Sequence, residues 1–112
     1  MQGNIALLAR SFTAAGTLAQ YQPVTATGAA ASAAGNAIGS ANVAAVSGDR
    51  YTATIAGTAL FVANGAIAAG AKVEVDTDVT KVVTIASGVA IGRALNAAAA
   101  AGDIVEVLLI AN

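Results

Sequence analysis

Carboxylates are the side chains of this sequence best able to do chemistry, because it contains no histidine and no cysteine. Glu74, Asp76 and Asp78 occupy every second position, as oxygen ligands do in calcium loops. Calcium loops also need a glycine at the turn and a bidentate glutamate further on, and no such pattern follows here. On a strand, Glu74 and Asp76 point to the same side, so we expect a solvated face there and no metal site.

The segment from Gly65 to Val73 approaches a phosphate-binding P-loop. That motif requires a lysine directly after its second glycine, then serine or threonine for the magnesium ion. Here Ala71 separates Gly70 from Lys72, and Val73 follows the lysine. The segment also leads into a strand pattern where the motif requires a helix. We therefore expect no nucleotide binding.

The missing residue types exclude most enzymes. Histidine is the commonest acid–base group and metal ligand, and cysteine is required for disulfides, thiolate chemistry and cysteine zinc sites. Asp49 and Asp103 each follow a glycine, where a side chain caps the turn backbone. We expect no catalytic, cofactor-binding or metal-binding residues and no enzymatic activity.

Charge and hydropathy speak against two classes of partner. The net charge is −1, and the 5 lysines and arginines are scattered, so no basic patch for nucleic acid can form. No apolar segment of about 20 residues is present, which argues against a membrane helix. Arg10 interrupts the apolar N-terminus, so we expect no secretory signal and action in the cytosol or in a particle assembled there.

One stretch of the chain occurs twice. Residues 35–41 and 88–94 share the pattern G-x-A-I-G-x-A, and each is followed by a Gly-Asp pair, at Gly48 and at Gly102. Upstream, the triplet at Ala14 matches the triplet at Ala68. The repeat predicts related units at about 14–57 and 68–112 within a single β domain of residues 14–112, behind an N-terminal arm of residues 1–13.

Strand patterns dominate both units. Residues 50–55 alternate between a polar face of Arg50, Thr52 and Thr54 and an apolar opposite face, which is typical of a half-buried strand. Gly57 then permits a turn before a further strand at 58–63. Similar patterns cover 18–24, 72–76, 81–85, 89–95 and 104–110. We predict an all-β fold, a small β-barrel or β-sandwich-like domain built from two related β units.

The two copies differ on one strand face. Aligning the Gly-Asp pairs places Arg50, Thr52 and Thr54 opposite Ile104, Glu106 and Leu108. The last strand is therefore predicted to be buried on both sides, either inside the domain or in a subunit contact. At the other end of the chain, apolar residues form an edge strand or an arm that reaches a neighbour. The contact candidates are Ile5, Leu7, Leu8, Phe12, Ile104 and Leu108.

The ordered motifs of the C-terminal half resemble those of a known family. They read A-I-A-A-G-A-K-V-E-V from Ala66, K-V-V-T from Lys81, I-G-R-A-L from Ile91 and A-G-D-I-V-E-V-L from Ala101. In order and spacing they resemble the capsid cement, or decoration, proteins of tailed bacteriophages. The resemblance covers most of residues 35–112 and little of residues 1–34.

The resemblance implies a compact β domain on the outer surface of the phage capsid, made in the host cytoplasm. Its implied partners are the major capsid protein and copies of itself, as a homotrimer at three-fold or quasi-three-fold positions. Its implied role is to stabilise contacts between capsid subunits, without enzymatic activity or cofactor. Another structural or adhesive virion protein, such as a head-fibre base or host-surface binding module, is the alternative.

Overall fold

Every regular element in the described part of the chain is a β-strand. The computed structural model describes residues 5–110. Its strands are β1 (Ala6–Thr13), β2 (Pro23–Val24), β3 (Gly39–Ala41), β4 (Arg50–Val62), β5 (Lys72–Val75), β6 (Val82–Thr84), β7 (Gly92–Ala94) and β8 (Ile104–Leu109). They form one sheet that curls into a nearly closed barrel, which confirms the predicted all-β class. None of the described residues belongs to a helix that could span a membrane.

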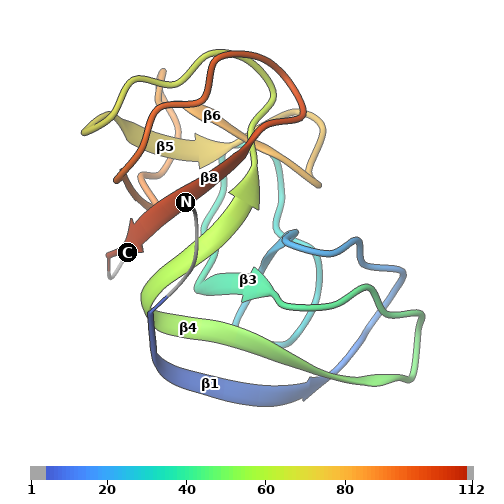
Figure 1. Cartoon of the computed structure of the whole chain (residues 1–112). Helices are drawn as coiled ribbons and strands as arrows, with labels where there is room; N and C mark the ends of the chain where they lie inside the picture. Colours follow the sequence, from blue (N-terminus) through green and yellow to red (C-terminus); the bar gives the residue numbers. More distant parts are fainter. Residues whose placement is uncertain (1–4, 111–112) are drawn as a thin grey trace.

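Strand β4 connects the two halves of the sheet. Its first half pairs antiparallel with β1 and β3, and its second half pairs antiparallel with β8 (Figure 1). The turn expected at Gly57 is wrong, because β4 runs through this glycine as a single strand of 13 residues. Gly57 has φ +91°, and a Cβ there would clash with the carbonyl oxygen of Ile5. The glycine therefore serves a bend inside a continuous strand.

Matching backbone hydrogen bonds relate the two halves of the chain. The Ala14 N–H donates to the Asp49 carbonyl at 2.7 Å, and the Ala63 N–H donates to the Asp103 carbonyl at 2.8 Å. The pair Leu18–Ala45 likewise corresponds to the pair Ile67–Ala98. Ala14 therefore corresponds to Ala63, and the sequence match of Ala14 with Ala68 is wrong. The chance similarity of two Ala-Ala-Gly triplets produced that match.

The two units differ in the length of one hairpin. In the first half, Val24 bridges Ala30 around a turn in which the Gly28 N–H donates to the Thr25 carbonyl at 3.0 Å. In the second half, the longer β5–β6 hairpin occupies this place. We infer two units, unit 1 at residues 5–56 and unit 2 at residues 57–110, with β1 as the first strand of unit 1.

Each unit has its own core. The unit 1 core is made of Phe12, Ala14, Leu18, Val24, Ala41, Ala45, Tyr51 and Ala53. The unit 2 core contains mainly residues 59–107, together with Ala31 and Ala37, which come from unit 1. Gly92 lies close to β8, since a Cβ there would clash with the Val107 side chain. The segment around Ala31 and Ala37 therefore helps to close unit 2.

The predicted solvated face at Glu74 is wrong. This side chain is buried, and its Oε1 accepts the Ala86 N–H at 2.9 Å. Gly88 lies against the carboxylate, and Oε2 has no hydrogen-bond partner within residues 5–110. Asp76 instead accepts hydrogen bonds from the Asn64 side chain and the Asp78 N–H. Among these described residues, no cluster of three or more carboxylates is placed to share a metal ion.

Tyr51 ties the unit 1 core to the turn at residues 25–28. Its ring packs on Phe12, with the two ring centroids 6.0 Å apart. Its hydroxyl donates to the Gly28 carbonyl at 2.8 Å in a buried position. Burial raises the pKa of this hydroxyl above its usual value of 10.0, because the phenolate would lose its hydration.

We expect Tyr51→Phe to lower the free energy of unfolding by about 1 kcal/mol, because the buried Gly28 carbonyl loses its donor. Above pH 10.0 the unfolded chain releases the Tyr51 proton while the folded chain retains it. The stability of the unsubstituted protein should therefore fall with rising pH by an amount that Tyr51→Phe lacks. Urea unfolding of both proteins at about pH 8 and about pH 11 measures this difference. Parallel pH profiles would contradict it.

Candidate contact surface

The predicted contact residues divide into exposed and buried side chains. In β1 and just before it, Ile5 is 67% exposed, Leu7 77% and Leu8 53%. In β8, Leu108 is 43% exposed and Ile104 is half-buried. The predicted burial of β8 on both sides is therefore wrong within a single chain. Exposed leucines and isoleucines at both places are available to a partner.

Phe12 differs from the other candidates. It is only 7% exposed and belongs to the unit 1 core, where it packs on Tyr51. The Arg10 guanidinium lies 5.2 Å from the Phe12 ring centroid and covers one side of the ring. A side chain enclosed in this way cannot reach a partner, so we leave Phe12 out of the contact surface. Phe61 has the equivalent place in unit 2, where it is fully buried.

Thr58 brings the two groups of exposed residues together. The Ile5 N–H donates to Thr58 Oγ1 at 2.6 Å, and the Thr58 N–H donates to the Ile5 carbonyl at 2.8 Å. Thr58 lies directly opposite Leu108 on the neighbouring strand. Its hydroxyl in turn donates to Glu106 Oε2 at 2.8 Å. Ile5 is thereby fixed beside the exposed side of β8.

A row of side chains crosses the sheet from this point. Thr58 pairs with Leu108, Leu108 with Arg93, and Arg93 with Lys72. Residues directly opposite one another in antiparallel strands share a face, so these four side chains lie on the same side of the sheet. Leu108, Arg93 and Lys72 are all exposed. The opposite side of the same strands forms the unit 2 core.

Further apolar residues extend this row into a surface. Leu60 pairs with Glu106 and Val62 with Ile104, while the Leu95 N–H donates to the Glu106 carbonyl at 2.8 Å. Leu95 is exposed, and Leu60, Val62 and Ile104 are half-buried. We call the whole set the outer face: Leu60, Val62, Lys72, Arg93, Leu95, Ile104, Glu106 and Leu108. Sequence reasoning missed five residues of this face, although continuing the alternation of 58–63, 72–76 and 89–95 would have identified them: Leu60, Val62, Lys72, Arg93 and Leu95.

Unit 1 buries the equivalent row. It consists of Thr54, Ser40 and Pro23, which pair across β4, β3 and β2. Thr54 is fully buried, and the Ser40 hydroxyl donates to the Leu60 carbonyl at 2.6 Å. The distribution of polarity is thus the reverse of the usual one: threonine is buried in unit 1, while Leu108 is exposed at the equivalent place in unit 2.

The chemistry of the outer face is that of a contact surface. Its centre is apolar, and its carboxylate, Glu106, already accepts a hydrogen bond from Thr58. Its two cations are Lys72 and Arg93, and Arg93 also donates to the Gly70 carbonyl at 2.6 Å. Such a face favours a partner that presents an apolar centre and acceptors or carboxylates at one side.

We expect Thr58→Val to free the segment at Ile5, because valine preserves the shape and removes the hydroxyl. The Ile5 N–H loses its acceptor, which should lower the free energy of unfolding by about 1–3 kcal/mol and accelerate exchange of the Ile5 amide. Thr52→Val is the matched control, since Thr52 is exposed on the same strand and should change stability by less than about 0.5 kcal/mol. Equal unfolding energies and unchanged Ile5 exchange would refute this role of Thr58.

A solved structure shares this fold. The N-terminal base of head fiber gp8.5 from bacteriophage phi29 superposes with a TM-score of 0.73 at 15% sequence identity. The match covers 92% of this chain and 93% of that one. No curated protein sequence matches this chain. The likeness to the head fiber base therefore concerns the arrangement of the strands.

A comparison with protein families identifies the chain more directly. The sequence pattern of the phage cement proteins matches residues 6–109, which span both units and the whole outer face. This match also confirms the resemblance carried by the C-terminal motifs. Because it extends over nearly the full sequence, the chain belongs to the phage cement protein family.

Proposed function

We propose that the protein binds the outer surface of the phage capsid through its outer face and stabilises contacts between major capsid protein subunits. Family membership makes the chain a structural component of a phage virion. The observation that carries the finer proposal is the exposed Leu108 at a place where unit 1 buries Thr54. Leu108, on the same face as Leu95 and Ile104, leaves apolar surface in contact with water in the free protein. Binding to a capsid would remove that surface from water and so stabilise the complex.

The segment at the start of β1 extends the proposed contact. Ile5 is held beside Thr58, and Leu7 lies against Gly57 at the bend of β4. Both side chains are exposed. A partner surface that covers Leu108 would cover this segment as well. The two predicted groups of contact residues then act as one surface.

Many copies would make modest contacts sufficient. Binding at three-fold or quasi-three-fold capsid positions, with three copies meeting as a homotrimer, would multiply the contribution of each outer face. Such stabilisation requires no catalysis, which agrees with a surface made of aliphatic side chains, two cations and one carboxylate. Stabilisation would appear as greater resistance of filled heads to heat.

A second candidate is a base for a head fibre or a host-surface binding module. The shared fold of the phi29 head fiber base favours it. The two functions differ in copy number: a cement protein is present in hundreds of copies per particle, whereas a vertex or fibre component is present in far fewer. Quantifying the protein against the major capsid protein in purified particles distinguishes them.

We expect Leu108→Ser to weaken capsid binding about tenfold, because about 1.4 kcal/mol of apolar burial is lost at each contact. Val46→Ser is the matched control, since Val46 is 57% exposed in a unit 1 loop outside the outer face. Heads lacking the protein are mixed with each variant, and bound copies are counted by gel densitometry. Equal binding of both variants, or heads equally heat-stable with and without the protein, would contradict the proposal.

A further inference from the structure

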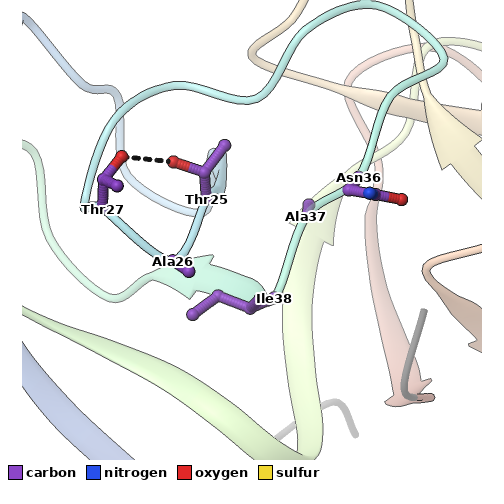
Figure 2. A pocket seen from close by; sticks show the side chains of 6 residues that line it. All are labelled: Thr25, Ala26, Thr27, Asn36, Ala37 and Ile38. Atoms are coloured by element: carbon purple, nitrogen blue, oxygen red, sulfur yellow. Dashed lines mark hydrogen bonds between the residues drawn. The ribbon is translucent and has the colours of Figure 1, made fainter.

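A pocket of about 350 Å³ opens in unit 1, and none of the residues that line it belongs to the outer face. One wall is the turn formed by Thr25, Ala26 and Thr27, and the other is the segment Asn36, Ala37 and Ile38 (Figure 2). The Thr25 and Thr27 hydroxyls are 3.0 Å apart and hydrogen-bonded at the rim. Its lining combines an apolar floor with a few polar groups, as ligand sites usually do.

Unit 2 contains an equivalent cleft. The Ile38 N–H donates to the Val24 carbonyl at 2.9 Å, and the Ile91 N–H donates to the Val73 carbonyl at 3.0 Å. These matching bonds fix the correspondence of the walls on either side. On one wall, Ala26 follows Val24 by two residues as Val75 follows Val73, so Ala26 corresponds to Val75. On the other wall, Asn36 precedes Ile38 by two residues as Val89 precedes Ile91, so Asn36 corresponds to Val89. In both units, two equivalent segments are joined by the same backbone hydrogen bond and form the two walls of a cleft.

In unit 2 the cleft is occupied by the chain itself. The Ala34 N–H donates to the Val75 carbonyl at 2.9 Å, and the Ala34 carbonyl accepts the Val89 N–H at 3.0 Å. Ala34 belongs to a tight turn in which the Gly35 N–H donates to the Ser32 carbonyl at 3.0 Å. Its φ of +56° is unusual for a residue other than glycine. One small residue thus joins both walls through its backbone alone.

In unit 1 the equivalent backbone groups are unused. The Ala26 carbonyl and the Asn36 N–H have no hydrogen-bond partner within residues 5–110. Their counterparts in unit 2, the Val75 carbonyl and the Val89 N–H, both bond to Ala34. An acceptor and a donor on facing walls are complementary to the N–H and carbonyl of a single inserted residue.

The space beside the walls favours a small residue. In unit 2, a Cβ on Gly88 would come within 2.6 Å of the Ala34 Cβ, so the glycine makes room for the inserted alanine. Gly35 holds the same position in unit 1, as the first glycine of the repeated G-x-A-I-G-x-A pattern. The glycine limits the size of the inserted residue in unit 2, and the same glycine is present beside the unit 1 cleft.

We propose that the unit 1 pocket binds a tight turn of small residues on a partner protein, with one alanine, serine or glycine inserted between Ala26 and Asn36. The inserted N–H donates to the Ala26 carbonyl, and the inserted carbonyl accepts the Asn36 N–H. This repeats between two proteins the contact that Ala34 makes within the chain. The site is separate from the outer face, so it does not depend on capsid clamping.

The test uses the folded protein and synthetic peptides followed by amide NMR. The probe is the acetylated and amidated peptide Ala-Ser-Ala-Ala-Gly-Asn-Ala, the sequence of residues 31–37. At about 5 mM peptide, we expect shifts confined to the amides of residues 25–27 and 36–38. A peptide with glycine in place of its Ala34 should bind at least as well, because glycine takes a positive φ without strain. A peptide with valine there should not bind.

Two protein variants control for non-specific effects. Thr27→Trp fills the pocket from an exposed position and should abolish the shifts. Thr17→Trp places the same side chain at an exposed position outside the pocket and should leave them unchanged. The proposal is overturned if no shifts appear, if they persist in Thr27→Trp, or if the valine peptide binds equally. Shifts at Val75 and Val89 would also overturn it, because they would show the peptide displacing Ala34 from unit 2.

Discussion

The bend of strand β4 at Gly57 is the constraint on which the rest of the molecule depends. Before the bend β4 completes unit 1, and after it β4 begins unit 2. Only a glycine fits there, because φ is positive and the Ile5 carbonyl occupies the place of a Cβ. The next residue, Thr58, holds Ile5 through two hydrogen bonds. The bend thus sets the relation of the units and places Ile5 next to Thr58, the residue that pairs with Leu108 of β8.

The differences between the two units account for the positions of both proposed contact sites. The two units share their anchoring hydrogen bonds and their close-approach glycines, so their equivalent surfaces can be compared directly. Unit 1 buries Thr54 where unit 2 exposes Leu108, and unit 2 fills the cleft that unit 1 leaves open. Unit 1 therefore buries the row that unit 2 exposes, and unit 2 fills the cleft that unit 1 leaves open to a partner. Both proposed contacts follow from this asymmetry.

Sequence alone predicted the strand class, and it identified two residues of the outer face, Ile104 and Leu108. Alternation at residues 50–55 identified a half-buried strand, and comparing the copies singled out Leu108. The sequence could not distinguish a turn from a bend within a strand at Gly57, because a glycine with positive φ occurs in both. Nor could it show that Phe12 faces the core, since both faces of an edge strand can carry apolar residues. The one sequence feature that pointed to burial of Phe12 was Phe61, the residue at the equivalent place in unit 2.

Other features depend on contacts between distant residues. The sequence pattern predicts Glu74 at the surface. In the structure Gly88 lies against its carboxylate, which accepts the Ala86 N–H. The unit 1 pocket is recognisable only by comparison with the cleft that Ala34 fills. Neither follows from a local pattern, because the segment around Ala34 leaves its own unit to close the other.

Hydroxyl-radical footprinting of the protein, free and bound to phage heads, measures whether the outer face is covered by the capsid. We expect oxidation of Leu95 and Leu108 to fall strongly on binding, while oxidation of Val46, which is exposed outside the outer face, should stay the same. Unchanged labelling of Leu108 in saturated particles, or equal protection of Val46, would contradict the claim that the outer face is the capsid-binding surface.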